Sequence, residues 1–335
     1  MIKKIRFSDK IFLAGSSGMV GNAVKKSLEK AGYGMKIHNG QILFPSKKEL
    51  NLLEENSVNN WFKENKPEVV ILAAAKVGGI YANSHYPAEF LLENLKIQIN
   101  VIQSAWRHNS RRLIFLGSSC IYPKFADQPI KEEYLLNSSL EETNQNYAIA
   151  KIAGLKLCES LRSQYGFDAI TLMPTNLYGP HDNYHPDNSH VIAALIRKFV
   201  IAKKENLSKV ICWGTGSALR EFMHVADLAD AIIFCLENWD PTSINSPKDD
   251  FGNSLNHLNV GTGIDISIKD LSYKISKIVG FKGEINWDKS KPDGTPRKLL
   301  DVSRIKKLGW SPKIDLDTGI KKTLQQLDLP SLYNF

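Results

Sequence analysis

The stretch IFLAGSSGMVGNAVKKSLEK, residues 11–30, decides the fold of this 335-residue chain. Its first four residues are apolar and predict a buried strand, and residues 19–30 have the periodicity of a helix that ends near Gly32. Between them Gly15, Gly18 and Gly21 form a GxxGxxG loop, where glycine permits a positive φ and a close approach of the backbone. Free N–H groups at the start of the helix suit the pyrophosphate of a dinucleotide. Because the spacing differs from GxGxxG, a turn that only connects strand to helix stays an alternative.

The alternation of short apolar runs and helix-periodic segments continues along the first half of the chain. We expect strands at 68–72, 113–116 and 169–173, a short strand within 35–43, and helices at 87–107, 147–165 and 191–204. Strands separated by helices predict an α/β fold with a Rossmann-like, doubly wound parallel sheet that is covered on both faces. We place a dinucleotide-binding domain at 1–175 and mainly a smaller α/β substrate-binding domain at 176–335, with some chain returning to the first domain.

Composition narrows the class of protein. A chain with 43% hydrophobic residues can bury a large core, and its net charge of +8 fits an anionic small molecule. The basic residues are scattered without a basic-aromatic repeat, which argues against nucleic acid. Four cysteines without metal-ligand spacing predict no metal site and a reducing cytoplasm. There is no apolar signal segment and no run of ~18 apolar residues, so we expect a soluble intracellular protein without a membrane partner.

The segment PSKKEL, residues 45–50, follows the expected second strand. At this place the dinucleotide ribose meets an acidic residue in NAD sites and a cation in many NADP sites. Lys47 and Lys48 therefore favour NADP, although each one taken singly is as easily an ordinary surface lysine.

Two further stretches carry chemistry. NYAIAKIAG places Tyr147 and Lys151 four residues apart, on one face of a helix. An ammonium near a phenol favours the ionised phenol and eases proton exchange with a carbonyl or alcohol oxygen. FLGSSCIYPK, residues 115–124, is a strand that ends in a polar rim with Ser118 and Cys120. Taken alone, such a Tyr/Lys pair is common by chance, and a free cysteine is most often a small buried hydrophobe.

Longer matches extend over nearly the whole chain, from residue 15 to residue 302. They are GMVG, ELNLL, AAAKVGGI, LGSSCIYPK, YAIAKIAG, MPTNLYGPHDN, HPDNSHVI, REFMHV, NVGTG and KPDGTPRKLLDV. On these blocks the chain resembles the extended short-chain dehydrogenase/reductase family, and within it the GDP-L-fucose synthase group. The resemblance implies NADPH-dependent conversion of GDP-4-keto-6-deoxy-D-mannose to GDP-L-fucose, by epimerisation at C3 and C5 and reduction at C4. It also implies a GDP-sugar substrate and a homodimer formed through the helices expected at 87–107 and 147–165.

The resemblance assigns roles to five side chains. Ser118 would hydrogen-bond the substrate oxygen, Tyr147 would protonate it, and Lys151 would bind the ribose and tune Tyr147. Cys120 and His190 would exchange protons at C3 and C5, which are acidic because the C4 ketone delocalises a carbanion as an enolate. A thiol and an imidazole suit this task because their pKa values lie on either side of neutrality.

The resemblance also implies binding residues. Cofactor contacts are expected at Gly15, Ser16, Ser17, Gly18, Met19, Val20, Gly21, Lys47, Leu116, Gly117, Ser118, Ser119, Lys151, Pro174, Thr175, Asn176, Leu177 and His190, and substrate contacts at Lys198, Trp213, Arg220 and Asp293. Two positions depart from the family pattern. Ser17 stands where an arginine helps to hold the 2′-phosphate, and Lys198 stands where arginine is usual. Ser17, together with a long 35–45 segment, leaves NAD as the alternative to NADP(H).

Two other functions remain open at this stage. The first is another nucleotide-sugar epimerase or dehydratase on the same scaffold, which would lack the pair formed by Cys120 and His190. The second is a non-catalytic dinucleotide sensor, although Tyr147 and Lys151, which such proteins commonly lose, are both present.

Overall fold

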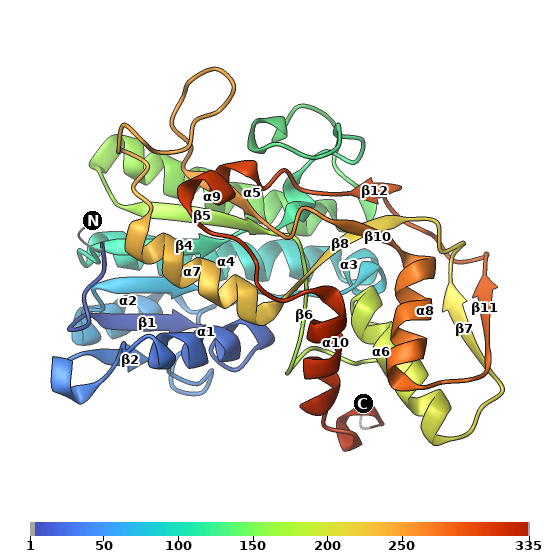
Figure 1. Ribbon diagram of the computed structural model, residues 1–335. Helices are drawn as coiled ribbons and strands as arrows, with labels where there is room; N and C mark the ends of the chain where they lie inside the picture. Colours follow the sequence, from blue (N-terminus) through green and yellow to red (C-terminus); the bar gives the residue numbers. More distant parts are fainter. Residues whose placement is uncertain (1–3, 334–335) are drawn as a thin grey trace.

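Six parallel strands form the central sheet of the computed structural model, which describes residues 4–333 (Figure 1). In spatial order they are β2 (Gln41–Leu43), β1 (Lys10–Ala14), β3 (Val69–Leu72), β4 (Arg112–Leu116), β5 (Ala169–Pro174) and β9 (His257–Val260). The direction of winding reverses between β1 and β3. In such sheets ligands bind beyond the carboxyl ends of the strands at the reversal. The predicted parallel α/β fold is confirmed.

Helices cover both faces of this sheet because successive residues of each strand point to opposite sides. Ile11 and Leu13 of β1 belong to a core shared with α1 (Met19–Lys30) and α7 (Val225–Asn238). Phe12 and Ala14 face the other way, into a core shared with α2 (Glu55–Asn65), α4 (Pro87–Arg107) and α5 (Gln145–Tyr165).

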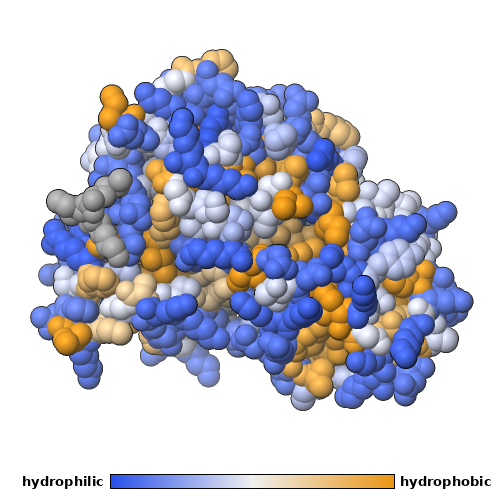
Figure 2. All heavy atoms as spheres, in the orientation of Figure 1, coloured by the Kyte–Doolittle hydropathy of each residue, from blue (hydrophilic) through white to orange (hydrophobic). Residues whose placement is uncertain are grey.

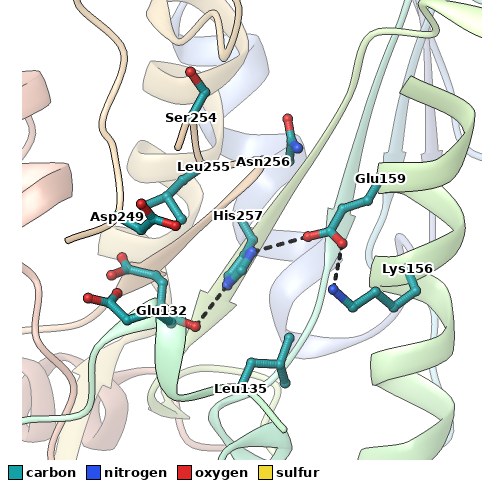
Figure 3. Close-up of a pocket in the computed structure, with 10 residues that line it drawn as sticks. Glu132, Leu135, Lys156, Glu159, Asp249, Ser254, Leu255, Asn256 and His257 are labelled. Carbon is teal, nitrogen blue, oxygen red and sulfur yellow. Dashed lines mark hydrogen bonds and ion pairs between the residues drawn. The ribbon is translucent and has the colours of Figure 1, made fainter. Parts of the chain in front are cut away.

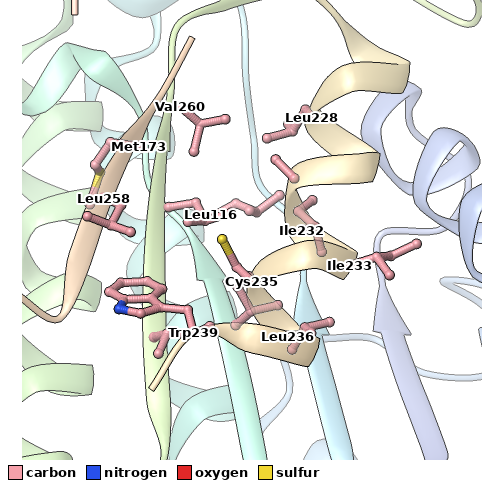
Figure 4. Close-up of a cluster of buried hydrophobic side chains, with 14 of the residues drawn as sticks. Leu116, Met173, Leu228, Ile232, Ile233, Cys235, Leu236, Trp239, Leu258 and Val260 are labelled. Carbon is pink, nitrogen blue, oxygen red and sulfur yellow. The ribbon is translucent and has the colours of Figure 1, made fainter. Parts of the chain in front are cut away.

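Figure 4 shows how α7 packs on the first of these faces. Leu228, Ile232 and Cys235 point from the helix toward the sheet, and all three are fully buried. They contact Leu258 of β9. This strand joins the sheet more than eighty residues after the end of β5, its neighbour in the sheet. The hydrophobic effect thus fixes a late segment of the chain onto the central sheet.

The remaining strands build a second lobe beside the carboxyl edge of the sheet. β8 (Leu219–His224) pairs with β6 (Asn176–Tyr178), β10 (Asp265–Ser267) and β12 (Arg297–Lys298), and β7 (Lys209–Trp213) pairs with β11 (Glu284–Asp288). α6 (Val191–Lys204), α8 (Ile268–Val279) and α10 (Leu316–Gln325) enclose a separate core with these strands. In Figure 2 hydrophilic residues cover most of this side of the molecule, and hydrophobic ones gather toward the middle and around α10.

Short helices complete the chain, and several border the site described below. They are α3 (Ile80–His85), α9 (Ser303–Leu308) and the 3₁₀ helices η1 (Lys36–His38), η2 (Ser119–Ile121), η3 (Glu132–Tyr134), η4 (Glu142–Asn144) and η5 (Pro330–Leu332). None of the helices between residues 4 and 333 combines the length and the apolar character that crossing a bilayer requires.

Candidate active site

Two of the three glycines in the loop after β1, Gly15 and Gly21, leave no room for a side chain. Gly15 has φ +89°, and a Cβ on it would lie 2.7 Å from the backbone of Ala74. A Cβ on Gly21 would lie 2.0 Å from the carbonyl oxygen of Gly15, so the first turn of α1 is pressed against the loop. Gly18 is the N-cap residue of α1, with no side-chain cap on the helix. The loop therefore offers a close backbone approach and free helix N–H groups, as a dinucleotide pyrophosphate requires.

The edge beyond β2 carries exposed positive charge. Lys47 and Lys48 are exposed, and the Nζ of Lys25 lies 3.9 Å from the ring centre of Phe44. The carboxylate of Glu49 accepts the N–H of Ser46 at 2.7 Å, which lowers its pKa. This edge fits the phosphate-bearing ribose expected from the sequence.

The turn after β4 presents the predicted hydroxyl and thiol side by side. Ser118 caps η2, and its Oγ accepts the N–H of Cys120 at 3.2 Å. Gly117 precedes it, and a Cβ there would lie 2.3 Å from the sulfur of Met173. Close packing of Gly117 on β5 thus fixes the position of the turn that carries Ser118 and Cys120.

Helix α5 brings Tyr147 to this turn. The Tyr147 hydroxyl forms a hydrogen bond with the side chain of Ser118. Burial raises the Tyr147 pKa, the neighbouring Cys120 raises it further, and the Ser118 hydrogen bond acts in the opposite direction. Ser118, Cys120 and Tyr147 are therefore neighbours, and the raised pKa keeps the phenol protonated at neutral pH.

Lys151 lies one helical turn further along α5 and is only 3% exposed. Burial lowers its pKa to about 7, and its Nζ lies 5.8 Å from the ring centre of Tyr147. The expectation that a fully charged ammonium would favour an ionised Tyr147 is not met in this state. Burial dominates for both groups, because it penalises the charged form of each.

His190 is the N-cap residue of α6, at the end of the loop that starts beyond β6. One glycine holds this loop: Gly79 donates its N–H to the carbonyl of Asn188, and a Cβ on Gly79 would lie 2.6 Å from the carbonyl oxygen of Ser189. As a residue His190 is partly exposed to solvent, although protein surrounds its titrating ring. Surrounding protein and then the charge of Lys298 lower the His190 pKa.

Lys298 also lies beside the thiol. Its Nζ is 3.6 Å from the Sγ of Cys120. Since Lys298 influences His190 and contacts Cys120, which in turn influences Tyr147, the predicted proton-transfer groups converge on one region. Arg220 joins them: burial lowers its pKa, and the nearby Cys120 counters that effect.

Pro174–Leu177, which the resemblance assigns to the cofactor, links the two lobes. Thr175 donates its hydroxyl, at 3.3 Å, and Asn176 its side-chain amide, at 2.8 Å, to the carbonyl of Glu221. The buried carboxylate of Glu221 accepts the N–H groups of Thr262, Gly263 and Leu300. The segment is thereby fixed at the carboxyl end of β5.

The four expected substrate contacts lie together on the second lobe. Lys198 donates to the carbonyl of Ile211 at 2.7 Å, and its Nζ lies 5.6 Å from the ring centre of Trp213, which is 45% exposed. The Asp293 carboxylate accepts the N–H and hydroxyl of Thr215 at 2.8 and 2.7 Å, and Arg220 donates to the carbonyl of Asp293. Asp293 thus orders the turn after β7, and Trp213 offers an open flat face.

Comparisons with known proteins identify the group to which these features belong. A profile described as the NAD dependent epimerase/dehydratase family matches residues 11–246. The chain belongs to this epimerase/dehydratase family. GDP-L-fucose synthase 1 of Arabidopsis thaliana is 50% identical to it over 94% of this chain and 92% of that protein. GDP-L-fucose synthase of Escherichia coli K12 is 49% identical, over 94% and 95%.

A solved structure agrees with the fold of this epimerase/dehydratase. MlghC, a GDP-mannoheptose C4 reductase from Campylobacter jejuni with NADP bound, is 38% identical and superimposes with a TM-score of 0.83 over 96% of this chain and 98% of that one. The residues of the present chain fit a dinucleotide, since the glycine loop leads into the free N-terminus of α1 and Lys47 and Lys48 are exposed beyond β2.

Lys298 is the site residue of this epimerase/dehydratase that the sequence analysis missed. It lies within the matched block KPDGTPRKLLDV, next to Arg297. The two side chains point to opposite faces of a strand. Arg297 pairs with Asp265 at 2.6 Å on the outside, and Lys298 turns toward Cys120. Sequence periodicity cannot assign the inward face in a two-residue strand.

A cavity of about 260 Å³ lies away from this site (Figure 3). In it His257 of β9 stands between Glu159 of α5 and the carbonyl of Glu132, and Glu159 also pairs with Lys156. Across residues 4–333 no cluster of three or more His, Cys, Asp or Glu side chains is arranged to hold a metal ion.

Proposed function

We propose that this chain converts GDP-4-keto-6-deoxy-D-mannose to GDP-L-fucose, with epimerisation at C3 and C5 followed by NADPH-dependent reduction at C4. The observation that carries the proposal is the convergence of Ser118, Cys120 and Tyr147 beyond the end of β4. The family and the curated GDP-L-fucose synthases of about half-identical sequence support it.

The cofactor would lie along the carboxyl edge of the sheet. The residues that would hold it are those of the glycine loop with Lys47, Leu116–Ser119, Lys151 and Pro174–Leu177. When bound, reduced nicotinamide supplies a hydride for C4. Lys151, which titrates near pH 7, can donate a hydrogen bond to a ribose hydroxyl in place of the one it makes to Leu116.

Epimerisation needs a base on one face of the sugar and an acid on the other. Cys120 and His190 are suited because each can hold or release a proton near neutrality. Protein surroundings and Lys298 lower the His190 pKa and favour the neutral imidazole. Ser118 and Tyr147 donate hydrogen bonds to the enolate oxygen, in the manner of an oxyanion site.

Reduction uses the same oxygen. Because its pKa is raised, Tyr147 enters this step as a neutral phenol and gives its proton to the C4 oxygen. Ser118 fixes the position of that oxygen relative to the phenol. The proton on the new C4 hydroxyl therefore comes from Tyr147.

The GDP moiety would bind on the second lobe. Arg220 presents a guanidinium that can bind diphosphate oxygens in pairs, and the open ring of Trp213 offers a stacking surface. Lys198 brings a point charge where an arginine would bring a fork. We assign residues 1–175 mainly to the cofactor and 176–335 mainly to the substrate, with β9 as the segment that returns.

We also propose a cytoplasmic homodimer. Half-exposed apolar residues on the outer sides of α4 and α5 support pairing through these helices: Leu92, Ile99, Ile149 and Tyr165. The four cysteines are free, as a reducing compartment favours.

The test supplies the pure protein with GDP-4-keto-6-deoxymannose and, separately, NADPH or NADH. We expect loss of nicotinamide absorbance, faster with NADPH, and GDP-L-fucose as the product. Cofactor that is bound but never oxidised would favour a sensor, and 4,6-dehydration of GDP-mannose would favour the dehydratase alternative. Either result overturns the proposal.

A further inference from the structure

Two cations face the thiol from neighbouring strands. Lys298 of β12 and Arg220 of β8 are register partners in a parallel pair, so their side chains leave the sheet on the same face. The Lys298 Nζ lies 3.6 Å from the Cys120 Sγ, and the Arg220 guanidinium interacts electrostatically with the same thiol. The sulfur therefore meets positive charge from both strands.

Lys298 is not neutralised by an acidic side chain. Within residues 4–333 it forms no ion pair, whereas its neighbour Arg297 pairs with Asp265. It is partly buried, and a desolvated ammonium is costly unless an anion or a strong acceptor lies beside it. The group within reach is the Cys120 sulfur, which is a poor acceptor as a thiol and a good partner as a thiolate.

We propose that Lys298 is a positioning residue that holds Cys120 as a thiolate, ready to remove the proton from the carbon next to the C4 ketone. The inference rests on the proposed function and deepens it. In the step, the S–H bond forms as the C–H bond breaks, the C–H electron pair moves into the enolate, and Lys298 keeps its proton throughout. The ammonium acts only through its charge and its hydrogen bond to sulfur.

Other charged groups around Cys120 do not replace Lys298. Tyr147 on α5 is a neutral phenol, and Lys124 is paired with Glu141 at 3.1 Å. Arg220 already donates to the carbonyls of Leu219 and Asp293. His190 from α6 is kept neutral by its surroundings and by Lys298 itself. Lys298 is thus the cation with a free donor aimed at the sulfur.

The test measures alkylation of Cys120 by iodoacetamide as a function of pH, in the protein without substrate. Cys120 is half-buried and the other three cysteines are buried, so the fast label reports on it; Cys120→Ser verifies the assignment. We expect Lys298→Met to move the profile to higher pH and to slow labelling at pH 7 about tenfold, as one pKa unit would. Lys298→Arg should restore most of the rate, and Lys131→Met, which removes a lysine paired with Asp250, should match the wild type.

Coincident profiles for Lys298→Met and the wild type would overturn the proposal, and so would a rise in KM alone, which would make Lys298 only a substrate contact.

A second measurement guards against misfolding. Solvent deuterium should enter C3 and C5 more slowly in Lys298→Met at pH 6.5, and the deficit should shrink at pH 8.5, because higher pH favours any thiolate without the help of a cation. Absence of exchange in the wild type would sink the proposed function and would leave the labelling result intact.

Discussion

The Nζ of Lys151 donates a 2.8 Å hydrogen bond to the carbonyl of Leu116, the last residue of β4. This bond joins α5, which carries Tyr147, to the strand whose exit carries Ser118. The bond therefore holds the phenol and the hydroxyl at a fixed separation, and it does so with a lysine that is almost fully buried.

Burial of Lys151 makes the stability of the apoprotein depend on pH. Its folded pKa is about 7 against an ordinary value of 10.5, so the unfolded chain holds the extra proton between these values. The unfolding free energy should therefore rise with pH in that window, by at most about 1.4 kcal/mol per pH unit from this group. Chemical unfolding at pH 7, 8 and 9 should show a flatter rise in the unfolding free energy for Lys151→Met. The same variant should no longer reduce the keto sugar, as followed by nicotinamide absorbance. A Lys151→Met slope equal to that of the wild type would contradict the assignment; Lys63→Met, at an exposed position of α2, is the control.

The two catalytic steps should separate by mutation. Cys120→Ser should slow deuterium entry at C3 and C5 by roughly 10²–10⁴-fold, the usual worth of a general acid or base. It should still reduce the doubly epimerised ketone. Tyr147→Phe should show the converse, with exchange retained in part and reduction lost. Product analysis by NMR distinguishes them, and equal loss of both steps in both variants would argue against separate roles.

Gly21→Ala should disrupt the packing of the glycine loop against the first turn of α1. Its Cβ would lie 2.0 Å from the carbonyl oxygen of Gly15, so either α1 or the loop must move. We expect a loss of about 1–3 kcal/mol of stability from overpacking. NADPH affinity should fall roughly tenfold or more, since each 1.4 kcal/mol lost from binding is tenfold. Gly18→Ala is the matched control for stability, because the nearest atom to its Cβ would be at 3.6 Å. Equal melting temperatures for the two variants would refute this account.

Asp293→Ala should weaken substrate binding more than catalysis. The Asp293 carboxylate holds the N–H and hydroxyl of Thr215, and the reacting carbonyl is expected at Tyr147. Losing hydrogen bonds to a charged group costs about 1.5–3 kcal/mol, so KM for the GDP-sugar should rise about tenfold or more. Steady-state kinetics should leave kcat within about threefold, well under the 1.4 kcal/mol that a tenfold change represents. Asp293→Asn should have a KM between those of the wild type and Asp293→Ala. A fall in kcat at constant KM would contradict this prediction.

Local signals predicted several helices of the chain with their bounds. The helices at 19–30, 87–107 and 191–204 have the predicted bounds. Their apolar periodicity is strong and is bounded by clear signals, such as Pro87 at the start of the second helix. The strand expected within 35–43 covers only Gln41–Leu43, after a 3₁₀ turn. The resemblance named the residues that converge at Ser118 and Tyr147.

Other features depend on contacts between distant segments, which sequence patterns do not encode. β12 has two residues and exists because it pairs with β8, so nothing local predicted that Lys298 would stand opposite Arg220. The raised pKa of Tyr147 follows from burial, whereas the sequence suggested only the opposing effect of a nearby lysine. Charge and packing at the site arise only when the folded chain brings these segments together.

The position of β9 at the edge of the sheet bears on biosynthesis. Until residues 257–260 leave the ribosome, the outer edge of β5 has no strand to pair with, although every other strand of the sheet has already emerged. A nascent chain halted before that point would expose a row of unpaired N–H and C=O groups, the kind of edge that recruits other strands and aggregates. Chains truncated before residue 257 should therefore be insoluble when expressed. Assistance from a chaperone should matter most late in translation.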